Sequence, residues 1–336
     1  MARSIIALTP GDPDGIGPEV TWKAIRSGVA EKFGASLLCV GAAEPFRKLR
    51  APIIEARESD LHRGTVPPHR KTPAIWLLPA PERSTKFLPG FQSGWSIEHA
   101  TQLVQSGVAS ALVTGPISKE RLNRGGFPFP GHTEFLADLC GIKGAAQEPT
   151  MMLANDQLRV SLVTIHMALK DVPRALTRER LRRAIVHTVD HLSRWWGIRR
   201  PRVAVASLNP HAGEAGLFGH EEERIITPEV KALQKKYGAR CVLTGPLPAD
   251  TLFAKHYLAK PADKFDAVVC MYHDQGLIPV KLLDFPRTVN VTLGLPIVRT
   301  SVDHGVGFDI AHQNKADPTS LKSAIQLASQ IAKKIR

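Results

Sequence analysis

The sequence of 336 residues has few cysteines and no long apolar segment. Its four cysteines show no CxxC spacing, and three of them lie in or next to apolar runs, which indicates small buried thiols. No apolar run approaches the roughly 18 residues that span a bilayer, and Met1 is not followed by a charged start and a long apolar segment. We therefore expect a cytoplasmic protein with no membrane partner.

A basic motif with interleaved aromatic residues is also missing, although the formal net charge is +13. The basic residues are spread along the chain in short clusters, which are typical of solvated helix faces and helix ends. We therefore expect no nucleic-acid partner. A phosphorylated substrate or a dinucleotide would equally favour a positive field.

Short apolar runs alternate with helical stretches along the whole chain, and 43% of the residues are apolar. This rhythm predicts an α/β fold with largely parallel strands, in two domains or one elaborate unit. Helices are predicted near 178–196, 228–237 and 318–336. Strands are predicted at 4–9, 35–40, 74–78, 111–114, 151–154, 160–165, 203–208, 241–244, 267–271 and 289–293.

Two loops after predicted strands are rich in turn-forming residues. The string TPGDPDGIGPE at 9–19 can bring backbone N–H groups close to an anion, but it lacks the GxGxxG spacing of the usual dinucleotide site. Any NAD site must therefore use a different architecture. The string TGPISK at 114–119 is interpreted equally well as a ligand loop and as a turn before a helix.

Three histidines stand just beyond predicted strands: His166 in SLVTIHM, His211 in VAVASLNPHAGE and His273 in AVVCMYHDQG. If these strands are parallel, the imidazoles project where such sheets gather their chemistry, and a catalytic metal takes three protein ligands. Spacing alone leaves two interpretations open. The histidines are either ligands of one metal ion or separate structural residues held by hydrogen bonds.

Longer motifs carry a specific resemblance. The strings PGHTEFLADL, LNPHAGE, GPLPADTLF, MYHDQGLIPVK and VNVTLGLPIVRTSVDHG, together with the two loops above, closely resemble the 4-hydroxythreonine-4-phosphate dehydrogenase family of vitamin B6 biosynthesis. The match spans nearly the whole chain. It departs from the commonest form of the first motif at Asp14, where most members carry alanine.

The resemblance implies a two-domain α/β fold like that of isocitrate and isopropylmalate dehydrogenases, with largely parallel sheets and an interdomain active-site cleft. It also implies a homodimer whose active site is shared between subunits. By analogy, one domain covers 1–131 plus 301–336. The other covers 132–300 and holds the metal ligands and the dimer contacts.

The resemblance also implies a divalent metal such as zinc, magnesium or cobalt, bound by His166, His211 and His273, and NAD or NADP as cofactor. Asp250 and Asp274 are expected to orient a ligand histidine or accept a proton, or else merely to cap turns. Substrate contacts carried over from the family fall on His132, Thr133, Lys281, Asn290 and Arg299.

The reaction implied is oxidation of 4-phosphooxy-L-threonine to a β-keto acid, which decarboxylates to 3-amino-2-oxopropyl phosphate on the way to pyridoxal 5'-phosphate. A paralogous dehydrogenase of threonate or erythronate 4-phosphate, or of a cyclic dihydrodiol carboxylate, would keep the same histidines. Two further interpretations of the sequence are a metal-dependent hydrolase and a basic binding protein without catalysis.

Overall fold

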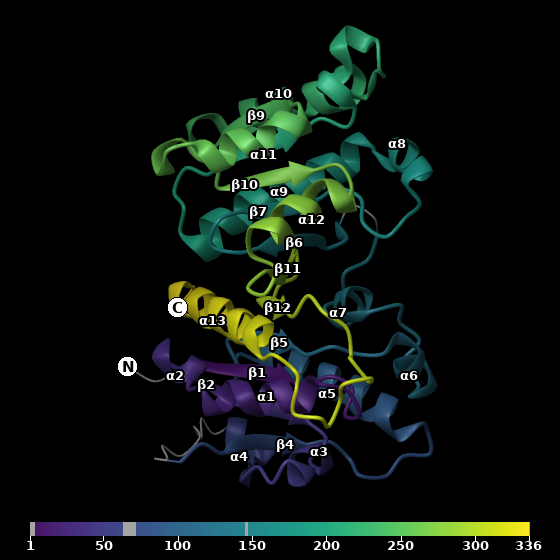
Figure 1. Cartoon of the computed structure of the whole chain (residues 1–336), viewed down its shortest axis with the longest axis vertical. Coiled ribbons are helices and arrows are strands. Elements are labelled where there is room, and N and C mark those ends of the chain that lie inside the picture. Colours follow the sequence, from purple (N-terminus) through teal and green to yellow (C-terminus); the bar gives the residue numbers. More distant parts are fainter. Residues whose placement is uncertain (1–3, 63–71, 145–146, 336) are drawn as a thin grey trace. The chain divides into compact units, whose positions relative to one another are not determined.

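The computed structural model describes residues 4–62, 72–144 and 147–335 (Figure 1). The chain divides into two compact units, Met1–Ile142 with Leu295–Arg336, and Lys143–Gly294. The first unit is therefore built from two separate segments of the chain. Residues 132–142 and 295–300 lie in this first unit, whereas the family analogy placed residues 132–300 in the second.

The described part of the first unit contains six strands in the order β3-β4-β2-β1-β5-β12, and each neighbouring pair is parallel. Their bounds are β1 Ser4–Thr9, β2 Ala35–Gly41, β3 Ile53–Glu55, β4 Ile75–Pro79, β5 Ala111–Thr114 and β12 Arg299–Ser301. Since β12 comes from the second chain segment, its pairing with β5 joins the two segments of this unit.

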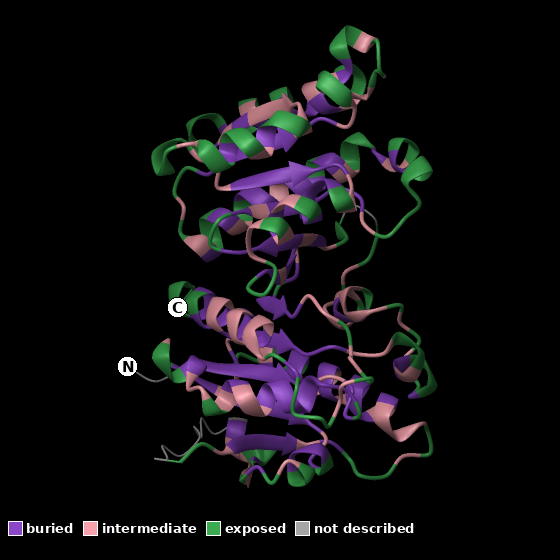
Figure 2. Ribbon diagram, in the orientation of Figure 1, coloured by how far each residue is buried: buried purple, intermediate pink, exposed green. Residues whose placement is uncertain are grey.

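Helices cover both faces of this sheet, which explains why its central strands β1 and β5 are buried along their whole length. Ile5 and Ala7 of β1 share a core cluster with Ile97 of α5, while Ile6 and Leu8 point to the other face and are also fully buried (Figure 2). The helices are α1 Gly17–Arg26, α2 Val29–Lys32, α3 Glu44–Lys48, α4 Glu58–His62, α5 Leu88–Gln105, α6 Lys119–Arg124, α7 His132–Leu139 and α13 Thr319–Lys334.

The described part of the second unit contains six strands in the order β11-β6-β7-β10-β8-β9. Strands β7, β10, β8 and β9 are parallel, whereas β6 is antiparallel to both β7 and β11. Their bounds are β6 Thr150–Ala154, β7 Arg159–Leu162, β8 Arg202–Ala206, β9 Val242–Leu247, β10 Ala267–Cys270 and β11 Val289–Leu293.

The core of the second unit forms where α11 and α12 pack on the sheet through Leu252, Leu277 and Val280. Its α-helices are α8 Val172–Ala175, α9 Arg178–Trp196, α10 Thr227–Tyr237, α11 Ala249–Leu258 and α12 His273–Asp284. Short helical turns of other types occur at Leu169–Asp171, Pro210–Gly216, Glu222–Ile226, Gly238–Arg240 and Pro261–Asp263.

The structure confirms the predicted α/β class with largely parallel strands, and each of the ten predicted runs contains a strand. The sequence prediction missed β3 and β12, which have three residues each. Such short strands are too brief to show an alternating pattern. Among the residues described, none of the helices is both long and apolar enough to cross a membrane.

Candidate active site

Three neighbouring strands of the second unit end just before the three histidines predicted to bind metal. Strand β10 lies between β7 and β8 and is parallel to both. His166 follows β7, His273 follows β10 and His211 follows β8. Because the carboxyl ends of parallel strands lie at one edge of the sheet, the three segments that carry these histidines begin side by side.

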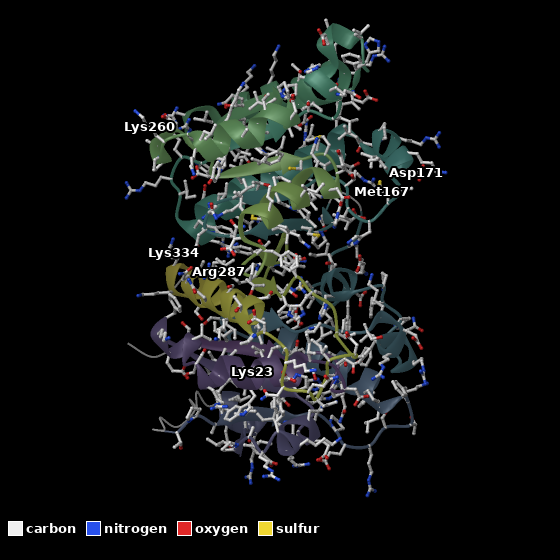
Figure 3. All side chains as sticks on the ribbon, viewed as in Figure 1. Lys23, Met167, Asp171, Lys260, Arg287 and Lys334 are labelled. Atoms are coloured by element: carbon white, nitrogen blue, oxygen red, sulfur yellow. The ribbon has the colours of Figure 1, made fainter. Side chains whose placement is uncertain are left out.

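His166 and His273 lie close together, with ring centroids 5.6 Å apart. His166 is exposed, as is its neighbour Met167, which projects from the second unit in Figure 3. The Oδ1 atom of Asp274 lies 2.7 Å from Nδ1 of His273. A carboxylate can only accept, so Nδ1 carries the proton and the lone pair of His273 resides on Nε2, the arrangement found at many metal-bound histidines.

His211 lies in a segment of unusual backbone conformation. Residues 211–215 all have positive φ values, between 42° and 81°, and four of these five residues are not glycine. The left-handed region costs roughly 1–2 kcal/mol for each such residue, so surrounding contacts must hold the segment in place. The exposed imidazole of His211 has its ring centroid 6.3 Å from that of Phe218.

The donor chemistry suits a divalent transition metal, but one chain does not assemble all three ligands. Within the described ranges, no group of three or more His, Cys, Asp or Glu side chains is arranged to hold a metal ion. His166 and His273 supply neighbouring imidazoles, and the Asp274 contact leaves Nε2 of His273 available. His211 stands outside this pair.

A buried arginine marks a second centre of chemistry, in the first unit. Arg299 at the start of β12 is 2% exposed, and its Nε and Nη2 atoms donate to Oγ1 of Thr114 at 3.1 and 2.7 Å. Burial lowers the pKa of Arg299 to about 9. A guanidinium removed from water in this way favours a bound anion such as a phosphate or carboxylate.

His132 belongs to the same centre. Its Nε2 atom is buried and has no hydrogen-bond partner among the described residues. Burial, and then the positive charge of Arg299, hold the pKa of His132 well below its ordinary value, so the imidazole is neutral near pH 7. A buried, unpaired ring nitrogen beside a buried cation suits a ligand oxygen. Thr133 follows in the first turn of α7 and is half-buried.

The remaining predicted site residues lie in the second unit. Lys281 on α12 is half-buried, with its ammonium 5.4 Å from the ring centroid of Phe285. Asn290 lies on β11 opposite Leu153. Asp250 is exposed in the first turn of α11, and no contact joins it to any of the three predicted metal ligands among the described hydrogen bonds and ion pairs.

The loop at 10–16 does not present its amides to a ligand. The N–H groups of Asp12, Asp14, Gly15 and Ile16 donate to Pro116 O, Asp12 Oδ1, Asp12 O and Val306 O. Gly11, with φ of 88°, is needed because an added Cβ would lie 2.0 Å from Pro116 O. These four amides are therefore not available to the anion that the sequence suggested.

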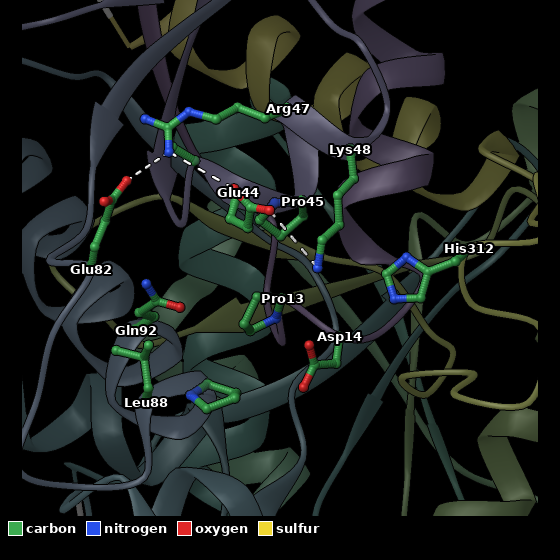
Figure 4. Close-up of a pocket in the computed structure, with 12 residues that line it drawn as sticks. Pro13, Asp14, Glu44, Pro45, Arg47, Lys48, Glu82, Leu88, Gln92 and His312 are labelled. Atoms are coloured by element: carbon green, nitrogen blue, oxygen red, sulfur yellow. Dashed lines mark hydrogen bonds and ion pairs between the residues drawn. The ribbon is translucent and has the colours of Figure 1, made fainter.

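A cavity of about 330 Å³ opens in the first unit beside this loop (Figure 4). It lies at the segments that follow β1, β2 and β4, where parallel sheets commonly bind ligands. Arg47 at its wall pairs with Glu82 at 2.7 Å, and Lys48 lies 4.0 Å from Glu44. The prediction from sequence missed this cavity because its lining comes from five separate segments.

The two units together define a class of protein, an α/β enzyme with strand-end histidines suited to a metal and a buried site suited to an anion. The sequence model of a family described as pyridoxal phosphate biosynthetic protein PdxA matches residues 89–328. The chain belongs to this PdxA family.

Full-length relatives agree with this membership. A 4-hydroxythreonine-4-phosphate dehydrogenase of Desulfosudis oleivorans is 45% identical, over 97% of this chain and 95% of the relative. A crystal structure of the enzyme of that name from Klebsiella pneumoniae has a TM-score of 0.84 at 37% identity, covering 98% of this chain and 99% of that one. A Bradyrhizobium diazoefficiens relative, 42% identical over 99% of this chain and 98% of its own, bears the provisional name D-threonate 4-phosphate dehydrogenase.

Replacing Arg299 with methionine should abolish the stabilisation that an anion confers. Wild-type protein is expected to show a higher Tm in about 10 to 50 mM inorganic phosphate at constant ionic strength, because a ligand that binds only the folded state stabilises it. The Arg299→Met variant should lose this increase in Tm. Arg299→Lys should keep less than half of it, because lysine lacks the planar guanidinium that can donate two parallel hydrogen bonds to an anion.

Arg240→Met is the matched control, since Arg240 is exposed, its guanidinium donates to the backbone carbonyls of Tyr237 and Lys236, and its Cζ lies 5.8 Å from the ring centroid of Tyr237. It should respond to phosphate as wild type does. An undiminished Tm increase in Arg299→Met would show that the anion binds elsewhere.

Proposed function

We propose that the protein is an NAD(P)-dependent and metal-dependent dehydrogenase of vitamin B6 biosynthesis. It oxidises 4-phosphooxy-L-threonine to a β-keto acid, which loses carbon dioxide to give 3-amino-2-oxopropyl phosphate. The observation that carries the proposal is the pair of neighbouring imidazoles, His166 and His273, with Asp274 fixing the tautomer of the second. Relatives along the full chain are dehydrogenases by name.

The metal would be held by His166, His211 and His273. When a divalent ion is bound, the chemistry supplied is that of a Lewis acid, which lowers the pKa of the secondary hydroxyl and polarises the ketone. Neutral imidazoles suit zinc or cobalt better than magnesium, which prefers oxygen ligands. Asp274 keeps the proton of His273 on Nδ1.

The substrate's anionic groups would be bound by the buried centre of the first unit. Arg299 supplies a buried cation whose guanidinium is held in place because its Nε and Nη2 atoms donate to Thr114. His132 supplies an Nε2 atom with no hydrogen-bond partner among the described residues. Thr133 would add a hydroxyl. In the second unit, Lys281 and Asn290 would bind the remaining oxygens.

The cavity of the first unit is our candidate for the adenosine end of the cofactor, because it lies at the carboxyl ends of parallel strands. Its two cations, Arg47 and Lys48, each face a glutamate. This pairing favours the ribose 2'-hydroxyl of NAD over the 2'-phosphate of NADP, since a phosphate would have to compete with Glu82 and Glu44.

We propose that a homodimer forms through α12. Ile278 and Leu282 on this helix and Phe285 at its C-cap are spaced three or four residues apart and are 65%, 84% and 61% exposed. An apolar stripe of this kind marks an interface. Since α12 begins at His273, a second copy bound there would lie beside the metal ligands and could contribute a histidine that the single chain does not bring to the pair.

The alternative substrates of the paralogous dehydrogenases are not favoured by the comparisons. The relative with 45% identity and the structure with a TM-score of 0.84 both carry the name of the 4-hydroxythreonine-4-phosphate enzyme. The Bradyrhizobium diazoefficiens relative with the threonate name, at 42% identity, does not outweigh them.

Purified protein should reduce NAD in the presence of 4-phosphooxy-L-threonine, and reduce NADP more slowly. Chelation should remove the activity, and zinc or cobalt should restore it. His211→Ala should lower kcat/KM by at least about 100-fold because a metal ligand is lost. The measurement is absorbance of the reduced nicotinamide.

His220→Ala is the control for this variant, because His220 is exposed near the same loop and pairs with Glu223 at 3.3 Å. It should retain wild-type activity. If metal is bound but the nicotinamide stays oxidised, this substrate is excluded, and activity on threonate or erythronate 4-phosphate would instead support the paralogous function.

Leu282→Glu should convert the dimer to a monomer and reduce activity, because a carboxylate would be buried at the interface. Sedimentation velocity measures the oligomeric state, and circular dichroism checks the fold. Leu258→Glu, at an equally exposed leucine at the end of α11, should stay dimeric. A wild-type sedimentation coefficient for Leu282→Glu would contradict this interface.

A further inference from the structure

A buried carboxylate stands behind the segment that carries His211. Glu222 is 5% exposed and opens a π-helical turn, Glu222–Ile226. Its Oε1 atom accepts hydrogen bonds from the backbone N–H groups of Leu208 and Asn209, at 2.7 and 2.8 Å. Its Oε2 atom accepts from Nδ2 of Asn209 at 2.9 Å. One side chain therefore holds the backbone and side chain of the residue two positions before His211.

The held residues stand at a change of backbone direction. β8 ends at Ala206, Asn209 is still extended with φ of −90° and ψ of 156°, and the left-handed segment starts two residues later. Gly213, in the middle of that segment, also approaches the same carboxylate, since an added Cβ would lie 2.9 Å from Oε2 of Glu222. The carboxylate thus bonds the residues just before His211 and leaves no room for a side chain at Gly213, two residues after it.

We propose that Glu222 is a positioning residue for the metal site, and that its carboxylate sets the place from which the imidazole of His211 reaches the ion. The inference rests on the proposed metal function of His211. A run of left-handed residues does not keep its conformation unaided, so the contacts that enforce it determine where the imidazole points. Glu222 is assigned no contact with the ion or the substrate and acts only through the segment.

The neighbouring acidic residues Glu221 and Glu229 make different contacts from those of Glu222. Glu221 also accepts from Nδ2 of Asn209, at 2.7 Å, but bonds neither of the two amides. Glu229 is as buried as Glu222, yet its carboxylate pairs with Arg182 through two contacts, at 2.7 and 3.1 Å, and so joins α10 to α9. The effect of losing any buried carboxylate can therefore be separated from the effect of losing the hydrogen bonds of Glu222 to Leu208 and Asn209, which we call the Glu222 clamp.

Zinc affinity of the full-length protein tests the proposal without relying on catalysis. The dissociation constant for Zn²⁺ is measured by competition with a chromophoric chelator, and the site geometry by the visible spectrum of the Co²⁺ form. Glu222→Gln should weaken Zn²⁺ binding by about 10 to 100-fold, the range typical of residues that orient a metal ligand. The amide nitrogen of Gln cannot accept, so one partner of the carboxylate must be lost.

Glu229→Gln is the matched control. It should lower the Tm, because the buried carboxylate of Glu229 loses its ion pair with the exposed Arg182, and leave the Zn²⁺ dissociation constant within about twofold of wild type. Glu221→Gln should weaken binding less than Glu222→Gln, because all three hydrogen bonds accepted by Glu222 remain. A Co²⁺ spectrum changed in Glu222→Gln and unchanged in Glu229→Gln would show that geometry, and not general stability, is altered.

The outcomes separate this inference from the proposed function. If wild type binds no zinc, or His211→Ala binds it equally well, the metal function of His211 is wrong. If His211→Ala is weakened and a folded Glu222→Gln is not, the positioning role is overturned. If Glu222→Gln fails to fold, the Zn²⁺ affinity of Asn209→Ala is measured instead. A weaker affinity supports the positioning role of Glu222, and an unchanged affinity contradicts it.

Discussion

The parallel pairing of β10 with both β7 and β8 is the constraint on which the proposed metal site depends. Strands that run in one direction, about 4.8 Å apart, deliver the segments after them to a single edge. His166, His273 and His211 each follow one of these strands. The sheet alone does not position all three histidines. His211 lies in a segment with a left-handed backbone, and other residues must hold that segment in place, Glu222 above all in our proposal.

The two units offer groups suited to ligands of opposite charge. The second carries imidazoles at the ends of neighbouring strands, which suit a metal cation, and Asp274 contacts one of them, His273. The first buries the cation Arg299 against Thr114 and a neutral histidine with an open ring nitrogen, which suits an anion. The proposed substrate has a phosphate and a carboxylate as well as a hydroxyl and an amine, so the proposed function gives a role to residues of both kinds.

Much of the fold could be predicted from the sequence because burial on both faces leaves long apolar runs, as at Ser4–Thr9 and Ala267–Cys270. The histidines could be found for the same reason, since each follows such a run. Asp274 could be found as a neighbour of His273. Asp250, for which the sequence left open an orienting, proton-accepting or turn-capping role, makes no contact with the three histidines among the described hydrogen bonds. The clamp by Glu222 was not predicted, because a contact between residues 13 and 14 positions apart leaves no periodic signal.

X-ray absorption at the zinc edge tests the central claim, that the three strand-end histidines bind one metal ion. The full-length protein, loaded with one zinc per subunit, is predicted to show nitrogen or oxygen neighbours at about 2.0–2.1 Å with outer-shell scattering from three imidazoles. Each of the variants His166→Ala, His211→Ala and His273→Ala should lose one imidazole. Sulfur neighbours at about 2.3 Å, or a spectrum that none of these substitutions changes, would contradict the account.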